Sequence, residues 1–119
     1  MKYAYLAMAA AVATAFVASN VSADTLNRQV VVHNITDTTV ERLYITNSDY
    51  SDWLRDTLRP DQVMYSDQEI NYNVDDGTGH CLYDFKAVFK GGAVREGYQL
   101  NVCTARHIDI TASGIVVAY

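Results

Sequence analysis

The chain has 119 residues, of which 9 are Lys or Arg and 14 are Asp or Glu, giving a formal net charge of −5 at pH 7. This balance argues against a nucleic-acid-binding protein, because phosphates need clustered basic residues, and it disfavours binding to anionic lipid surfaces. The length suits one domain and not two.

The N-terminus has the organisation of a cleavable secretory signal. Met1-Lys2 is a short basic start, residues 4–17 are almost all apolar, and Val21-Ser22-Ala23 is an A-x-A-like cleavage site. A buried helix or an uncleaved anchor are the alternatives, but about 20 apolar residues are needed to span a bilayer and this run is shorter. We therefore expect residues 1–23 to be removed, leaving residues 24–119 as a single exported domain.

The mature chain is small and contains two cysteines. Its 96 residues carry a net charge of −6, because the signal removes one basic residue and no acidic one. A domain of that size buries under about 70% of its unfolded surface, so its core is marginal. Cys81 and Cys103 are expected to pair in an oxidising compartment, contributing roughly 3 kcal/mol. Two free thiols or half of a metal site are the alternatives, although no C-x-x-C spacing supports zinc.

Apolar alternation with a period of two dominates after residue 28 and predicts a mainly β fold. Strands are expected over residues 29–33, 39–46, 67–74, 81–89, 94–103 and 105–111, with the apolar tail 115–119 docking as a further strand. Residues 48–58 break the alternation and predict either a short helix, capped by Ser48 or Ser51, or an ordered loop. About seven short strands and one disulfide indicate a small antiparallel β-sandwich.

The hairpin around Gly91-Gly92 can be drawn in two registers. A two-residue loop gives good cross-strand pairs: Phe89 with Val94, Phe85 with Tyr98, and Tyr83 with Leu100. In that register Cys103 points away from Cys81, whereas a three-residue loop that aligns the cysteines spoils the apolar pairs. A bulge between Leu100 and Cys103 would satisfy both demands; otherwise the disulfide joins strands that are not paired in this register.

Several motifs resemble a family of small exported bacterial proteins with no established function. They are a V-x-N-x-T strand start at 32–36, Leu43-Tyr44 leading to Asp52-Trp53, D-D-G-T-G at 75–79, C-x-Y-D-F-K-A-V-F at 81–89, and N-V-C at 101–103. The resemblance runs from Val30 to Cys103 and departs in the tail, Thr111 to Tyr119. It implies the fold and the exported location only. Members often carry the label argininosuccinate lyase, but that enzyme is a large helical tetramer whose Gly-Ser-Ser loop is absent from this sequence.

Carboxylates gather in two expected loops. Asp75 and Asp76 open the D-D-G-T-G turn, and Asp49, Asp52 and Asp56 lie in the earlier loop. Carboxylate and carbonyl oxygens can hold calcium, and loops cluster at the ends of a sandwich. An ordinary hairpin turn explains the same pattern, since the ligand spacing of an EF-hand is missing. Calcium is therefore the one cofactor that the sequence leaves open.

Other candidates for chemistry are sparse. His33, His80 and His107 could bind a transition metal, or could be solvated. Asp84 lies in an apolar strand, where a buried carboxylate could act as an acid or base, or could form a salt bridge to Lys86 or Arg95. No G-x-S-x-G or H-E-x-x-H pattern occurs, so we predict no enzyme and no catalytic residue.

The aromatic residues of the 44–58 region give the remaining indication of function. Tyr44, Tyr50 and Trp53 would form an interaction patch if exposed together, whereas Trp53 buried at one end of the sandwich would be a core plug. We predict a non-enzymatic binding module of the periplasm or extracellular space, engaging an unidentified protein partner. A calcium-stabilised structural domain is the alternative.

Overall fold

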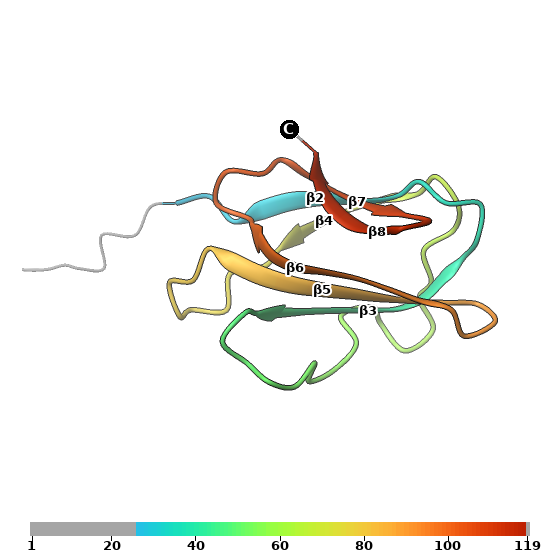
Figure 1. The fold of residues 1–119 in the computed structure, drawn as a ribbon, viewed down its shortest axis with the longest axis horizontal. Coiled ribbons are helices and arrows are strands. Elements are labelled where there is room, and N and C mark those ends of the chain that lie inside the picture. The colour runs from blue at the N-terminus through green and yellow to red at the C-terminus, as the bar shows by residue number, and fades with distance from the viewer. Residues whose placement is uncertain (1–25, 119) are drawn as a thin grey trace, which may run out of the picture.

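A computed structural model describes residues 26–118 (Figure 1). The predicted signal, residues 1–23, lies outside these residues, as does Tyr119. Residues 26–118 form strands and loops without a helix, as the mainly β prediction requires. The strands are β2 (Gln29–Asn34), β3 (Val40–Asn47), β4 (Glu69–Asn73), β5 (Leu82–Phe89), β6 (Val94–Asn101), β7 (His107–Thr111) and β8 (Gly114–Ala118).

The strands make two sheets, one with the order β4-β2-β7-β8 and the other with the order β3-β5-β6. Figure 1 shows the two sheets one above the other, with the chain crossing between them after β2, β3, β4 and β6. All described strand pairs are antiparallel, as predicted, except that β2 and β7 run parallel. The fold is therefore a β-sandwich with one parallel pair inside its larger sheet.

The core lies between the sheets and follows the alternation of the sequence. In β5 the side chains of Tyr83, Phe85, Ala87 and Phe89 are buried, while the intervening residues face outward. The predicted seventh strand is confirmed as β8, which pairs with β7 along its length and buries Ile115. Each large apolar side chain buried in this way contributes about 1.5–3 kcal/mol.

The 48–58 segment is an ordered loop that covers the free edge of β3. Asp56 Oδ1 accepts hydrogen bonds from the backbone N–H groups of Leu43 (2.8 Å) and Leu58 (3.0 Å). The Thr57 N–H donates to the Leu43 carbonyl at 2.7 Å. Leu54 has a positive φ of 66°, which a right-handed helix does not allow. The Asp56 side chain thus bonds backbone N–H groups that a helix would otherwise satisfy or leave free, and the segment forms a loop in place of the predicted short helix.

The β5–β6 hairpin uses a register that differs from both predicted ones near the turn. Val88 pairs with Val94 there, whereas Tyr83 pairs with Leu100 farther along, as predicted for the two-residue loop. The register shifts at Asp84, where β6 carries one extra residue. The prediction of a bulge between Leu100 and Cys103 is therefore wrong, and a bulge lies earlier in the strand instead. It comprises Tyr98 and Gln99, and Gln99 has a φ of 56°.

The disulfide between Cys81 and Cys103 is confirmed, with a Cα–Cα distance of 5.3 Å. Cys103 lies in a turn that follows β6 and not in a paired strand. Val102 still donates its N–H to the Cys81 carbonyl at 2.8 Å, and Ala105 closes the turn by donating to the Asn101 carbonyl at 3.1 Å. The turn, and not a bulge beside Cys103, brings the two sulfur atoms together.

Candidate functional site

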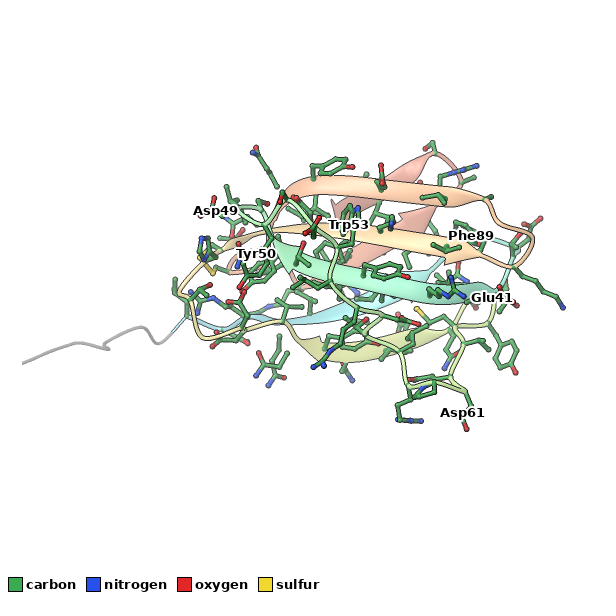
Figure 2. All side chains as sticks on the ribbon, turned by 90° about the horizontal axis from the view of Figure 1, so that it is seen from below. Glu41, Asp49, Tyr50, Trp53, Asp61 and Phe89 are labelled. Atoms are coloured by element: carbon green, nitrogen blue, oxygen red, sulfur yellow. A yellow bond between two sulfur atoms is a disulfide. The ribbon has the colours of Figure 1, made fainter. Side chains whose placement is uncertain are left out.

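The outer face of the β3-β5-β6 sheet carries a group of aromatic side chains that we call the aromatic surface. Its members are Tyr44, Tyr50, Trp53 and Tyr98. Tyr44 lies on β3 opposite Lys86 of β5, while Tyr50 and Trp53 come from the loop that follows β3 (Figure 2). Tyr50 and Tyr98 are 47% and 57% exposed, and both are therefore accessible to a partner.

Trp53 joins these residues together. Its ring centroid lies 6.0 Å from that of Tyr98, with the two planes at 45°. The Lys86 ammonium lies 4.8 Å from the Tyr44 ring centroid and 5.2 Å from the Trp53 ring centroid, within cation–π range. Trp53 is only half-buried and is not part of the hydrophobic core. The expectation that it plugs the end of the sandwich is therefore wrong.

Sequence reasoning missed Tyr98 as a member of this surface. In the predicted register Tyr98 faces Phe85 and would point into the core, but Gly97 occupies that position. A shift of one residue turns a strand side chain to the opposite face of the sheet. The bulge therefore places Tyr98 outside, beside Trp53. The neighbouring glycine was the one indication in the sequence. Gly97 faces the core beside Ile115 of β8, where a Cβ would not fit, so the larger Tyr98 is directed outward.

A small pocket of about 130 Å³ lies between the loop after β3 and the sheet. The residues that line it are Thr46, Tyr50, Ser51, Asp52, Trp53, Asp84 and Tyr98. The Asp84 Oδ1 atom accepts hydrogen bonds from Ser48 Oγ (2.7 Å) and from the backbone N–H of Gln99 (2.9 Å). This carboxylate thus fixes the bulge. Within residues 26–118, neither predicted salt bridge to Asp84, from Lys86 or from Arg95, is formed.

Asp76 is the centre of a hydrogen-bonded cluster at one end of the sandwich. It accepts from Asn47 Nδ2 (2.7 Å), from the Tyr83 hydroxyl (2.9 Å) and from Thr78. Burial opposes ionisation, but the hydrogen bonds from Thr78, Asn47 and Tyr83 prevail and lower the pKa of Asp76 to about 2. Burial and the bond to Asp76 raise the pKa of Tyr83 to about 12. The Asp76 carboxylate therefore holds the D-D-G-T-G loop against β3 and β5.

A chain of contacts from Thr78 through His80 to Asp49 was not predicted from the sequence. Thr78 Oγ1 contacts His80 Nδ1, and His80 Nε2 lies 2.6 Å from Asp49 Oδ2. The order hydroxyl, imidazole, carboxylate is that of a nucleophilic triad. However, the Thr78 hydroxyl has one proton, for which the ionised Asp76 competes with His80. The chain of contacts also ties two loops together.

Such contacts could not be found in the sequence, because Asp49 and His80 are 31 residues apart. The turn itself was visible in the D-D-G-T-G motif. Asp75 Oδ1 accepts the Gly77 N–H at 2.9 Å, which is ordinary turn chemistry. The D-D-G-T-G motif therefore predicted the turn correctly. It did not predict that Asp76 also bonds Asn47 and Tyr83 outside the turn.

The five carboxylates considered for calcium do not converge. Asp76 and Asp49 belong to the cluster just described, and Asp75 bonds its own turn. Asp52 lines the pocket beside Trp53, and Asp56 bonds backbone groups at the edge of β3. Nor do Cys, His, Asp and Glu side chains anywhere in residues 26–118 form a group of three suited to a metal ion. Calcium binding stays an untested hypothesis that no contact of these carboxylates favours.

The three histidines have no contact partner in common among the described residues. His33 Nε2 lies 2.8 Å from Asp67 Oδ1, and its Nδ1 lies 3.6 Å from Glu69. The hydrogen bond to Asp67 raises the pKa of His33 in spite of burial, which acts in the opposite direction. His107 lies on β7 opposite Val31 of β2. These histidines are positioned by carboxylates and strands, not by a shared site.

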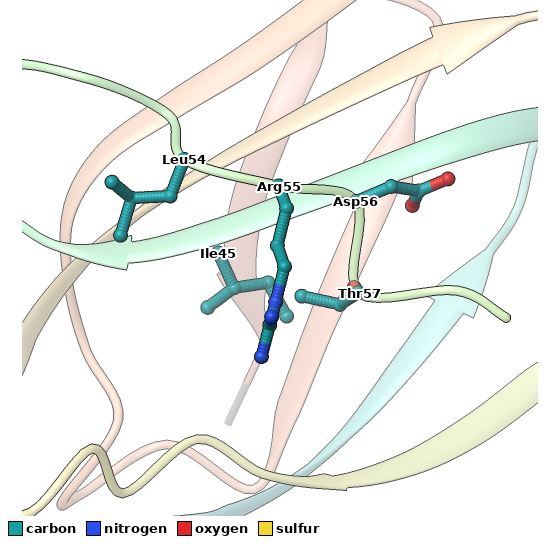
Figure 3. A pocket seen from close by; sticks show the side chains of 5 residues that line it. All are labelled: Ile45, Leu54, Arg55, Asp56 and Thr57. Atoms are coloured by element: carbon teal, nitrogen blue, oxygen red, sulfur yellow. The ribbon is translucent and has the colours of Figure 1, made fainter.

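A larger depression of about 410 Å³ lies beside the edge of β3. It is lined by Ile45, Leu54, Arg55, Asp56 and Thr57. Figure 3 shows the Arg55 side chain alongside Ile45, with the Asp56 carboxyl directed away from it. The lining combines the apolar side chains of Ile45 and Leu54 with the polar side chains of Arg55, Asp56 and Thr57, and none of these five residues is aromatic.

Comparison of the chain with protein-family models, with curated proteins and with solved structures gave no significant match. The resemblance drawn from its motifs therefore stays a prediction. Among residues 26–118 there is no helix with the length and apolar composition needed to cross a membrane.

Proposed function

We propose that this chain is an exported, non-enzymatic binding module that engages a protein partner through the aromatic surface. The observation that carries the proposal is the position of Trp53. A tryptophan in so small a domain would be expected to contribute to the core, yet here its ring is half-buried on the outside, next to the exposed Tyr98. Trp and Tyr supply most of the binding energy at protein interfaces.

The surface is also held in place before any partner arrives. The loop that carries Trp53 is fixed at its start by the Asp49–His80 contact and at its end by the bonds of Asp56 to Leu43 and Leu58. The Lys86 ammonium also contacts one face of the Trp53 ring, 5.2 Å from its centroid. Such preorganisation lowers the entropic cost of association.

Two further observations support an exported and non-enzymatic role. The disulfide between Cys81 and Cys103 is consistent with an oxidising compartment, where the predicted signal would direct the chain. In the single hydroxyl–imidazole contact of residues 26–118, that of Thr78 with His80, the Asp76 carboxylate competes with the imidazole for the one hydroxyl proton. Binding is thus the activity that the geometry favours.

Capture of partners from periplasmic and culture extracts would test the proposal. We expect the wild-type domain to retain a protein that Trp53→Ala does not retain. Tyr65→Ala is the matched control, because Tyr65 is 64% exposed and lies outside the aromatic surface. Circular dichroism should show that both variants are folded. Equal recovery of every partner by the wild type and by Trp53→Ala would contradict the proposal.

A further inference from the structure

The pocket beside Trp53 combines aromatic rings with acidic groups in its lining. The rings of Trp53 and Tyr98 are inclined at 45° to each other, and Tyr50 is a third aromatic lining residue. Asp52 and Asp84 are its two carboxylates. Both described hydrogen bonds to Asp84 use Oδ1, which leaves Oδ2 available to a ligand.

The charge around this pocket is negative. Asp52 and Asp84 line it, and Glu96 is held nearby by the hydroxyl of Tyr98 at 2.8 Å. Lys86 is the one basic side chain shown to contact a pocket residue in the part of the chain described, and its ammonium lies over the Tyr44 and Trp53 rings. Lys86 also stands opposite Glu96 in the β5–β6 pair, but none of the ion pairs found in residues 26–118 involves Asp52, Asp84 or Glu96.

We propose that this pocket receives the cationic end of a Lys or Arg side chain presented by a protein partner. The inference rests on the proposed function and specifies what the aromatic surface recognises. An ammonium or guanidinium group gains from an aromatic face and from a carboxylate in the same site. The volume of about 130 Å³ is well below the roughly 300–1,000 Å³ of small-molecule sites, and it suits one side chain.

The same geometry argues against two other ligands. A sugar ring stacks on a flat aromatic platform, whereas the Trp53 and Tyr98 planes are inclined at 45° to each other. A free small cation would leave the aromatic lining uncovered, although Tyr98 there is 57% exposed. A side chain attached to a protein fills the pocket and also buries this lining, which is the usual anatomy of an interface.

The single tryptophan of the chain makes the test direct. Its indole N–H gives one identifiable signal in a nitrogen–proton correlation spectrum of the intact domain. We would titrate Nα-acetyl-lysine methylamide and Nα-acetyl-arginine methylamide, with Nα-acetyl-norleucine methylamide as the uncharged control. The cationic probes should shift the Trp53 signal in a saturable manner, and the norleucine probe should not.

Variants of the acidic groups complete the test. Asp84→Asn keeps the oxygen that bonds Ser48 and Gln99 but removes the charge, and should weaken the binding of the cationic probe about tenfold. Asp61→Asn is the matched control, because Asp61 is exposed and lies away from Trp53 (Figure 2). Its affinity should equal that of the wild type.

The outcomes separate this inference from the proposed function. Absence of any response to the cationic probes, with partner capture still lost in Trp53→Ala, would overturn the inference and leave the proposed function intact. A response to a neutral disaccharide alone would also overturn it and indicate a carbohydrate ligand. Tighter binding of tetramethylammonium than of the lysine probe would overturn the assignment to a protein side chain. Loss of binding in Asp84→Asn, with Asp61→Asn unchanged, would support it.

Discussion

Asp76 shows how one side chain can connect distant parts of a small fold. It is ionised in the folded state with a pKa of about 2, against an ordinary value of 3.8, because Thr78, Asn47 and Tyr83 donate to it. A lowered folded-state pKa means that the ionised carboxylate stabilises the native state. This stabilisation is complete above the unfolded value and is lost as the pH falls from 3.8 through about 2.

We expect Asp76→Asn to lower stability at neutral pH and to flatten its dependence on pH in the acid range. The amide cannot accept the same set of charge-assisted bonds, and it has no proton to gain. Urea unfolding at pH 7 and at several values between 4 and 2 would measure this. Asp75→Asn is the control, because its oxygen bonds only its own turn. An acid limb as steep as that of the wild type in Asp76→Asn would refute the assignment.

At the same scale, the sequence identified important residues better than it identified their roles. The V-x-N-x-T strand start was visible, but the reason for its asparagine was not. Asn34 is fully buried, and its side-chain amide donates to the carbonyls of Thr38, Met64 and Tyr65. Two of these lie about thirty residues away. A buried amide with partners so far along the chain leaves no local pattern that could be read beforehand.

At the scale of elements, the point where β6 meets β8 closes one side of the sandwich. A Cβ on Gly97 would lie 2.1 Å from the Ile115 carbonyl oxygen and 2.9 Å from its carbon. Both atoms belong to the backbone, so they cannot rotate away as a flexible side chain would. The two sheets therefore approach closely there only because position 97 lacks a side chain.

Gly97→Ala should destabilise the domain by about 1–3 kcal/mol, the usual cost of forcing extra atoms into a packed site. The thermal and urea midpoints should both fall. Val94→Ala on the same strand removes a partly exposed side chain and should change stability far less. A Gly97→Ala variant as stable as the wild type would show that the β6–β8 contact is looser than described.

Strand positions were predictable because burial follows the alternation of apolar residues, and β2, β3 and β5 begin and end within one residue of their predicted limits. The register of the β5–β6 pair could not be predicted, because it depends on a bulge fixed by Asp84. That carboxylate accepts the Gln99 N–H and so stabilises a positive φ at that residue. The consequence for function is large, since the bulge alone turns Tyr98 outward to join Trp53 and so completes the aromatic surface.

At the scale of the whole molecule, the disulfide and the polar clusters lie at one end of the sandwich. Arg28 donates to the carbonyls of Gly79 (3.0 Å) and His80 (2.7 Å), next to Cys81. The disulfide joins this region to the turn after β6. The same loop region contacts Asp49, which begins the segment carrying Trp53. Stability at this end is therefore coupled to the position of the aromatic surface.

Replacing both cysteines, as Cys81→Ser with Cys103→Ser, should lower the free energy of unfolding by about 3 kcal/mol, because the bond closes a loop of 22 residues in the unfolded chain. Urea unfolding with and without a reducing agent would measure it, and the reductant should affect only the wild type.

The bond forms only if the chain reaches an oxidising compartment, so the native protein should begin at Asp24 and lack alkylatable thiols. Mass spectrometry that finds an intact Met1 and two alkylated sulfurs would reject both export and the stabilising bond.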